Sequence, residues 1–487
     1  MIQYLKKRTS GPERCKPGFV SLLFLLLLAV VFVLPVSSSF AYELTFQPRI
    51  TENLTYTDNL FLSSGDDPRD PKEGDGYSLF TPGFTGTISS RTMGASMSYD
   101  FGYTRYFRWS SQNDWNHNMN MSGWYALSRH TRIEVSDGLV YTADPLSDRN
   151  FAITLPPDST LPEDYTTRRV REPYLTNYGR LSITHQFGRD DSIVVEYGNG
   201  IRHDFGDYST GPETDRYRSA NYMRHTPSTT ITYWFNSRWG VELQGMYDQG
   251  NFREQPDTKS GTGRIRLTRR FNPHFDMYSE YTYYTISYDE EQGGNGATTF
   301  SRDYDTHSPI LGLNYSITQD LSLECHAGAV IQTMDQADTT VTFSGGLSLS
   351  KSYQYGSVRV YGSAGQAQGV YTDEAVGPSI YFEAGVTSTY QILEDLSCNV
   401  YGSFRRDDYG RANNDSLSGD SGGSDDTYGA GIGFNWHPYP WLGFDISYSF
   451  RQLVSGRDAG LYGQGYTENR GLLVITLTTP RPWRTTR

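Results

Sequence analysis

Residues 443–451 read GFDISYSFR, and this stretch shows the pattern that decides the fold. Its apolar and polar side chains alternate without a break: Phe444, Ile446, Tyr448 and Phe450 against Asp445, Ser447, Ser449 and Arg451. Successive side chains of a β-strand point to opposite faces, so a period of two predicts a strand with one apolar and one polar face. The alternation recurs at 321–333, 341–349 and 429–436, while no segment from Tyr42 onward keeps a helical period. The chain is therefore expected to be all-β.

The composition favours a membrane barrel over a soluble sandwich. The 487 residues include 38 Tyr, 24 Phe, 8 Trp and 49 Gly, but only 36% are hydrophobic and the mean hydropathy is −0.58. Such a chain is too polar for a helical membrane protein and unusually aromatic for a soluble one. A transmembrane β-barrel accounts for both properties, because half of each strand faces water in the lumen.

Turn lengths alternate along the chain, as they do in outer-membrane barrels. Short turns are predicted at 89–90, 129–130, 188–190, 236–237, 272–274, 318–320, 350–353, 393–395 and 437–440. Longer polar stretches lie between most of them, at 63–76, 144–172, 206–218, 254–261, 290–301, 409–424 and 455–463. The pattern predicts an antiparallel up-and-down transmembrane β-barrel of about 18–20 strands, the first at 44–61 and the last at 466–478. Eighteen strands stay possible because the connection at 336–338 is ambiguous.

Aromatic residues gather next to the short turns, among them Phe187, Phe235, Trp239, Phe271, Phe275, Tyr390, Trp436 and Trp441. Amphipathic rings settle at the headgroup level of a membrane. We therefore expect one interfacial girdle at the end of the barrel that carries the short turns, which we assign to the periplasm.

The first 41 residues are predicted to be a signal peptide. A basic segment precedes an apolar run at 19–36, and the small residues Ser39 and Ala41 suit a signal peptidase. A retained transmembrane helix is the alternative, since the run approaches roughly 18 residues. Cleavage after Ala41 would leave 42–487 as one barrel domain in the outer membrane of a Gram-negative cell, in contact with the lipid bilayer and the outer-membrane assembly machinery.

Charge argues against nucleic acid as a partner. Residues 1–41 carry five basic side chains and one acidic one, so their removal lowers the formal net charge from −13 to −17. Nucleic-acid binding needs a basic surface. The two cysteines of the mature chain, Cys325 and Cys398, are expected four strands apart, too far for a disulfide, so both are expected to be free small hydrophobes facing lipid.

The alternation also predicts which charged side chains line the lumen. The set comprises Arg264, Arg266, Glu280, Glu324, Arg359, Glu383 and Arg405. These charges could form opposed ladders that bias which solutes pass. Alternatively, they form internal salt bridges that stiffen the wall.

Other motifs give no catalytic, cofactor-binding or metal site. The GDSGG at 419–423 lacks a matching His and Asp, and Gly429, Gly431 and Gly433 lack the spacing of a phosphate loop. An acidic first loop offers oxygen ligands for Ca²⁺ but fits no EF-hand: Asp66, Asp67, Asp70, Glu73 and Asp75. His203-Asp204 is a weak candidate for an outer-membrane hydrolase, and we expect a non-enzyme.

Three segments carry a resemblance to a known family. PRITENLTYTDNL at 48–60 with TPGF at 81–84, and a late strand beginning ENR at 468–470, resemble the β-barrel porin family found with exosortase and exopolysaccharide systems. The resemblance covers nearly the whole mature length and implies an outer-membrane location and a link to surface-polysaccharide export. It transfers no catalytic residues. The chain departs from the usual pattern by continuing past Thr479 through Trp483 to Arg487, where barrels usually end on an aromatic residue.

Two functions follow as hypotheses. The first is a porin-like channel, or an accessory factor, that passes small solutes or polysaccharide, since 16–18 strands already leave a channel in porins. The second is a surface-binding or adhesion barrel that acts through its external loops, chiefly 144–172.

Overall fold

A computed structural model describes residues 42–65, 71–143, 173–205, 221–253, 257–289, 303–334, 337–367, 379–408, 423–456 and 465–486. The predicted signal peptide at 1–41, the loop at 144–172 and most of the GDSGG motif lie outside these residues.

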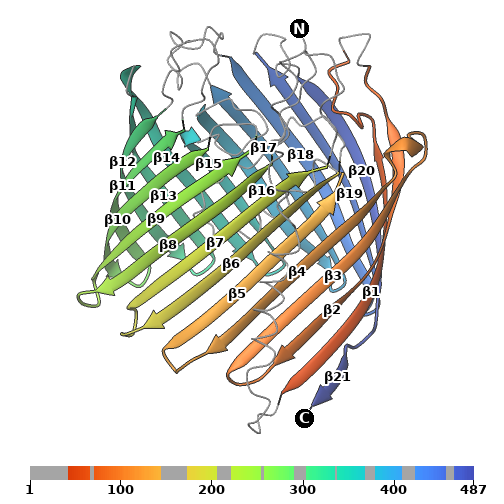
Figure 1. Ribbon diagram of the computed structural model, residues 1–487, viewed down its shortest axis with the longest axis horizontal. Coiled ribbons are helices and arrows are strands. Elements are labelled where there is room, and N and C mark those ends of the chain that lie inside the picture. Colours follow the sequence, from red (N-terminus) through yellow and green to blue (C-terminus); the bar gives the residue numbers. More distant parts are fainter. Residues whose placement is uncertain are drawn as a thin grey trace, which may run out of the picture.

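The described residues form a closed antiparallel β-barrel of twenty strands (Figure 1). Each strand pairs with its neighbours in chain order, and β1 pairs with β20 to close the cylinder. The strands are β1 (Glu43–Thr57), β2 (Asp75–Ser89), β3 (Met93–Tyr106), β4 (Asp114–Ala126), β5 (Thr131–Thr142), β6 (Tyr174–Gln186), β7 (Ser192–Asp204), β8 (Tyr222–Trp234), β9 (Trp239–Phe252), β10 (Thr258–Asn272), β11 (Phe275–Tyr288), β12 (Tyr304–Thr318), β13 (Leu321–Met334), β14 (Ala337–Tyr353), β15 (Gly356–Ala367), β16 (Ser379–Leu393), β17 (Leu396–Asp408), β18 (Ser424–Tyr439), β19 (Leu442–Ser455), β20 (Tyr466–Thr478) and β21 (Trp483–Thr486). The predicted all-β barrel is confirmed, at twenty strands rather than eighteen.

A short 3₁₀ helix, η1 (Ser110–Gln112), precedes β4. Within the described ranges, no helix has the length and apolar character needed to cross a membrane.

The two ends of the barrel differ in the length of their connections. Nine short turns join β2–β3 and every second pair after it up to β18–β19, and we call this the short-turn end. The opposite end, which we call the loop-side end, carries the connections β1–β2, β3–β4 and so on to β19–β20. One of these, between β13 and β14, is the connection that left the predicted strand count ambiguous. One predicted turn was misplaced: β14 runs through 350–353, because Ser352 pairs with Ser357 and Tyr353 with Gly356 across a two-residue turn.

The two faces of the sheet follow the predicted alternation. Ile446 and Tyr448 on β19 are about half exposed, at 55% and 49%, while the polar side chains between them lie on the other face. We call these the apolar face and the polar face. Cys325 pairs with Leu347 and Cys398 with Phe434, so both thiols are on the apolar face, and both are free. The aromatic residues predicted next to the short turns lie at the short-turn end.

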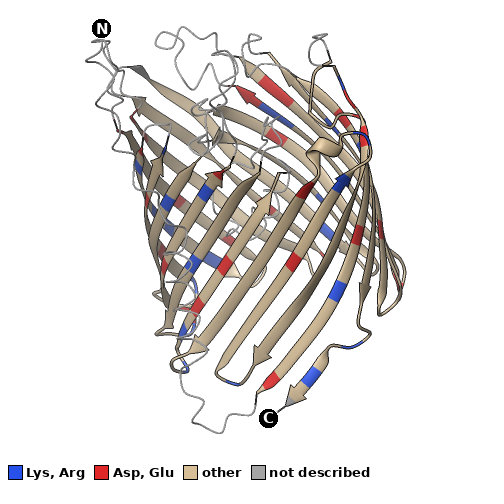
Figure 2. Ribbon diagram, turned by 45° about the vertical axis from the view of Figure 1, so that its right-hand side comes forward, with Lys and Arg blue, Asp and Glu red and all other residues tan. Residues whose placement is uncertain are grey.

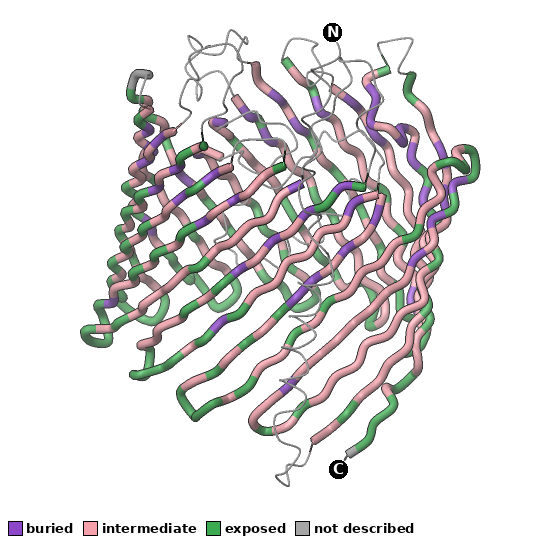
Figure 3. The backbone as a smooth tube through the Cα atoms, in the orientation of Figure 1, coloured by how far each residue is buried: buried purple, intermediate pink, exposed green. Residues whose placement is uncertain are grey.

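Burial is concentrated at the loop-side end (Figure 3). Three apolar clusters of buried residues lie there: Leu60 with Tyr77 and Tyr106; Leu62 with Leu453 and Tyr466; and Tyr284 with Ile286 and Tyr304. In Figure 3 the short turns at the opposite end are mostly exposed. Side chains are therefore packed together at the loop-side end and mostly exposed at the short-turn end.

The chain continues past the last barrel strand and returns to the first. β21 pairs antiparallel with the start of β1, with Trp483 opposite Phe46. The two rings stack with centroids 5.6 Å apart. The segment beyond Thr479, which departs from the usual barrel terminus, thus extends the sheet at the short-turn end.

Candidate functional site

Three of the predicted charged residues form one cluster on the polar face of β9–β11. Arg266 pairs with Glu280 at 2.6 Å, and Arg264 lies 3.9 Å from the same carboxylate. Arg264 also pairs with Glu242 on β9 at 2.7 Å. The Arg266 guanidinium lies 4.6 Å from the ring centre of Tyr278. Each arginine therefore has a carboxylate partner and an ordered position.

A second cluster lies near the loop-side end of β16 and β17. Arg405 pairs with Asp407 at 2.7 Å and lies 3.8 Å from Glu383. Its guanidinium lies 4.6 Å from the ring centre of Tyr381, and its side chain is only 9% exposed. Charges buried to this degree are stable only when paired and hydrogen-bonded. This cluster therefore belongs to the packed end of the barrel.

The remaining two predicted residues meet around one serine. Arg359 Nε donates a hydrogen bond to Ser348 Oγ at 2.8 Å. The strand register places Glu324 directly opposite Ser348. Glu324 makes no ion pair with another residue in the described ranges. The seven predicted residues thus fall into three groups, on β9–β11, β13–β15 and β16–β17.

Sequence reasoning missed further ion pairs on the polar face, four of which join well-separated or buried residues. These join Arg49 to Asp100, Arg180 to Glu196, Arg202 to Asp204, and Arg224 to Asp248. Figure 2 shows blue and red residues close together on neighbouring strands. The alternation places each of these residues on the polar face, but it gives no register between strands, and the register decides which charges meet.

The Arg49–Asp100 pair explains a glycine in the TPGF segment. Arg49 is on β1 and Asp100 on β3, and Gly83 of β2 lies between them in register. Arg49 Nε donates to Asp100 Oδ1 at 2.9 Å. A Cβ on Gly83 would lie 2.0 Å from that same oxygen. The ion pair therefore crosses β2 at a position where any side chain would have to displace the Asp100 carboxylate.

A recess of about 490 Å³ opens on the polar face of β1–β5 and β20. Amide side chains are prominent in its lining, notably three asparagines at alternate positions of one strand: Asn116, Asn118 and Asn120 of β4. Asn116 Nδ2 donates to Thr104 Oγ1 at 2.6 Å, and Asn120 Nδ2 donates to Asn118 Oδ1 at 2.9 Å. The spacing was visible in the sequence as NHNMN, but the neighbouring strands that complete the recess were not.

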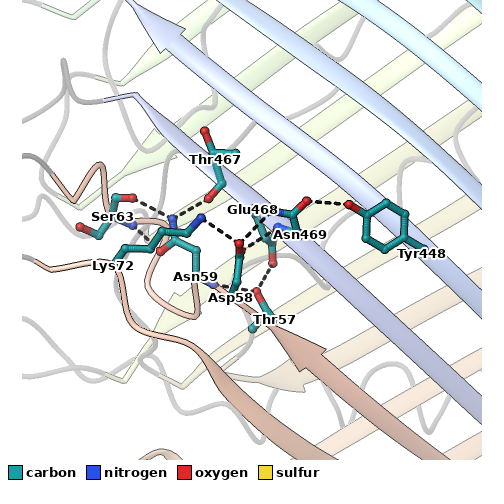
Figure 4. Close-up of polar contacts among 9 residues, drawn as sticks. All are labelled: Thr57, Asp58, Asn59, Ser63, Lys72, Tyr448, Thr467, Glu468 and Asn469. Atoms are coloured by element: carbon teal, nitrogen blue, oxygen red, sulfur yellow. Dashed lines mark hydrogen bonds and ion pairs between the residues drawn. The ribbon is translucent and has the colours of Figure 1, made fainter.

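Two of the segments that carry the resemblance, 48–60 and 468–470, meet at the barrel seam on the loop-side rim (Figure 4). Asp58 accepts hydrogen bonds from the backbone N–H and the side-chain amide of Asn469, both at 2.8 Å, and pairs with Lys72 at 2.9 Å. Thr57 Oγ1 donates to Glu468 Oε1 at 3.0 Å. The motif residues therefore join the first barrel strand to the last.

Asn59 holds the chain in a turn next to this seam through its side-chain hydrogen bonds. Its side-chain amide donates to the carbonyls of Ser63 at 2.7 Å and Thr467 at 2.9 Å, and its Oδ1 accepts from the Ser63 N–H at 2.9 Å. Asn59 is fully buried, and Leu62, with φ of 53°, is held in a left-handed conformation. These local bonds replace sheet pairing, so β1 ends at Thr57 rather than at the predicted residue 61.

Contacts at the seam lower the pKa of one carboxyl group that lies outside the strands, that of Asp58. Burial raises the pKa of Asp58, but the hydrogen bonds from Asn469 and Lys72 favour its carboxylate more strongly. The net result is a pKa below the usual value of 3.8. Asp58 is therefore an ionised acceptor at neutral pH.

Two other sequence candidates do not assemble into sites. Asp204 pairs with Arg202, whereas His203 points to the opposite face and contacts Phe205 edge-on at 4.7 Å. In the acidic first loop, Glu73 pairs with Arg108 at 2.8 Å, and the other predicted ligands except Asp75 lie outside the described residues. Among the described residues there is no group of three or more His, Cys, Asp or Glu arranged to hold a metal ion.

No protein-family model matches the chain, and no curated protein sequence matches it. Among solved structures, the chain is similar to the outer membrane protein OpdK from Pseudomonas aeruginosa, at 10% identity and a TM-score of 0.42, over 89% of this chain and 99% of that one. OccAB2 from Acinetobacter baumannii is 12% identical with a TM-score of 0.42, over 91% and 98%. The siderophore receptor PirA from Acinetobacter baumannii is 8% identical with a TM-score of 0.48, over 88% and 80%. These similarities assign the chain to no family.

Proposed function

We propose that this protein is an outer-membrane channel that passes small hydrophilic solutes. The observation that carries the proposal is a closed barrel of twenty antiparallel strands with one apolar and one polar face. An apolar face in lipid leaves the polar face to line the interior. Barrels of 16–18 strands enclose an aqueous channel, and twenty strands enclose a wider one.

The charged residues on the polar face support a lumen-lining role. Arg264, Arg266, Glu280, Glu383 and Arg405 all lie within 4 Å of an opposite charge. Paired charges present little net field to a passing ion, so they stiffen the wall more than they select by sign. The proposed passage therefore has weak charge selectivity.

The membrane assignment has a direct test. With the short-turn end in the periplasm, the loop-side end faces outward, and the signal peptide at 1–41 exports the chain to the assembly machinery. Recovery of the protein in the outer-membrane fraction with residue 42 at its N-terminus supports this arrangement. Recovery in the cytoplasmic membrane with residues 1–41 retained contradicts it.

The finer role that we propose is accessory to surface-polysaccharide export. Its support is the resemblance of the segments at 48–60, 81–84 and 468–470, which the barrel joins through the seam and the Arg49–Asp100 pair. Deletion of the gene should reduce surface polysaccharide while intracellular polysaccharide accumulates. If the amount of surface polysaccharide is unchanged, the export role is refuted, whereas the channel function is unaffected.

Planar-bilayer recording of the refolded chain tests the channel itself. We expect stepwise conductance with a cation-to-anion permeability ratio near unity, because five of the seven predicted wall charges are paired with an opposite charge. A barrel that inserts, as judged by its heat-dependent migration on gels, but stays silent would refute the channel. An adhesion role through the external loops predicts that outcome.

A further inference from the structure

We propose that the recess on β1–β5 and β20 is a binding site for a neutral saccharide unit. The proposal deepens the channel function and rests on it, because the recess lies on the face that would line the passage. The lining combines side-chain amides and balanced charges within one recess.

The amides supply the hydrogen-bonding chemistry. Each asparagine offers a carbonyl acceptor and an NH₂ donor, which suits hydroxyl groups that both donate and accept. Asn118 and Asn120 are joined to each other, and Asn116 is held by Thr104, so the row is ordered in advance. A preordered row of amides loses little conformational entropy when a ligand binds.

Two oxygen acceptors in the lining have no donor among the described residues. They are Asn53 Oδ1 and Asp114 Oδ2, both buried. A buried polar atom without a partner is costly, so these atoms favour a ligand that donates hydrogen bonds. Hydroxyl groups of a sugar supply such donors without bringing a charge.

The formal charges in the lining cancel. Arg49 and Arg470 contribute two positive charges, and Asp100 and Asp114 contribute two negative ones. The Arg49 charge is already matched by Asp100, and Arg470 donates to the hydroxyl of Tyr77 at 2.7 Å. An anionic or cationic ligand would therefore meet no excess of the opposite charge. The wall favours a neutral ligand.

The size of the recess fits the same class of ligand. A volume of about 490 Å³ lies within the roughly 300–1,000 Å³ range of small-molecule sites. Tyr77 and Tyr106 form a buried edge of the recess, where they pack against Leu60, so the amides rather than the rings face a ligand.

Saturation-transfer NMR on the full chain refolded in detergent tests the proposal, with maltose as the neutral probe and digalacturonate as an anionic probe of equal ring number. We expect a saturable signal from maltose and at least tenfold weaker binding of digalacturonate. Asn118→Leu and Asn53→Leu keep the side-chain volume but remove the amide, and each should weaken maltose binding about two- to tenfold. The matched control is Asn435→Leu, which removes an asparagine from the polar face of β18 outside the recess and should leave binding unchanged.

Three results would overturn the site: no saturable maltose signal, equal binding of the two probes, or equal loss in Asn435→Leu and Asn118→Leu. The comparison of the two probes on the unchanged chain decides the question even if a variant does not fold. Conductance separates this proposal from the channel function. A silent barrel that binds maltose refutes only the channel, and a conducting barrel that does not bind maltose refutes only the saccharide site.

Discussion

One ion pair near the loop-side end of the barrel and one at the short-turn end differ sharply in burial. Near the loop-side end, Arg202 and Asp204 pair with side chains only 5% and 1% exposed. At the short-turn end, Arg132 and Glu134 pair at 2.7 Å with both side chains 49% exposed. Buried partners depend on each other because neither charge has water, whereas exposed partners are solvated separately. The difference teaches that burial decides which pair is structural: the Arg202–Asp204 pair depends on both partners, whereas the Arg132–Glu134 pair is nearly dispensable. An exposed pair at the loop-side end, Lys259–Asp289, belongs with the second kind.

The largest effect is expected from removing a buried partner. Asp204→Ala removes the carboxylate that pairs with the buried Arg202 guanidinium and should lower the free energy of unfolding by about 3–5 kcal/mol. Urea unfolding in lipid vesicles, followed by tryptophan fluorescence, measures this loss. Glu134→Ala at the other end is the matched control and should cost less than about 1 kcal/mol. Equal losses in the two variants would abolish the contrast between the ends.

The Arg49–Asp100 pair lies between the two ends, and Gly83 tests it. Gly83→Ala places a Cβ against Asp100 Oδ1 and the Tyr99 carbonyl oxygen, so we expect a loss of about 1–3 kcal/mol. Gly471→Ala, where a Cβ would meet no atom within 4 Å, is the control. The penalty should shrink in an Asp100→Ala background, since part of it comes from displacing that carboxylate. A penalty of the same size in both backgrounds would show that the carboxylate plays no part.

The seam is expected to weaken in acid. The pKa of Asp58 is lowered below 3.8 in the folded chain, so its stabilisation is complete above 3.8 and is lost as the pH falls from there through the lowered pKa. Asp58→Asn should therefore cost about 1 kcal/mol at pH 7 and less at pH 3. Urea midpoints of both proteins at the two pH values give the comparison. A gap that widens in acid would contradict the assigned role.

The smallest effect is expected at an exposed turn of the short-turn end. Lys351 hydrogen-bonds to Asp320 in the β12–β13 turn and, together with Thr318, lowers the pKa of Asp320 to about 2. Stabilisation from this pair would be present above pH 3.8 and lost toward pH 2. Solvent and salt screen such a pair, so Asp320→Asn should leave the urea midpoint unchanged at physiological ionic strength. A clear loss at high salt would show that this end also depends on its ion pairs.

The alternation in the sequence was enough to predict the barrel class, because a side-chain period of two follows from strand geometry alone. It located the last barrel strand at 466–478, where β20 lies. The prediction was less accurate where side-chain hydrogen bonds to the backbone replace sheet pairing. The side-chain hydrogen bonds of Asn59 end β1 four residues before the predicted end, and the alternation of apolar and polar residues gives no sign of this.

The sequence by itself determined the strands, their two faces and the residue types on each face. Only the tertiary structure decided which residues meet. The strand register sets Arg49 across Gly83 from Asp100, and closure of the cylinder brings Asp58 to Asn469, 411 positions away. The physical reason is that alternation is a local property of the backbone, while register and closure depend on hydrogen bonds between distant strands. The ion pairs, the seam and the recess therefore exist only in the folded barrel.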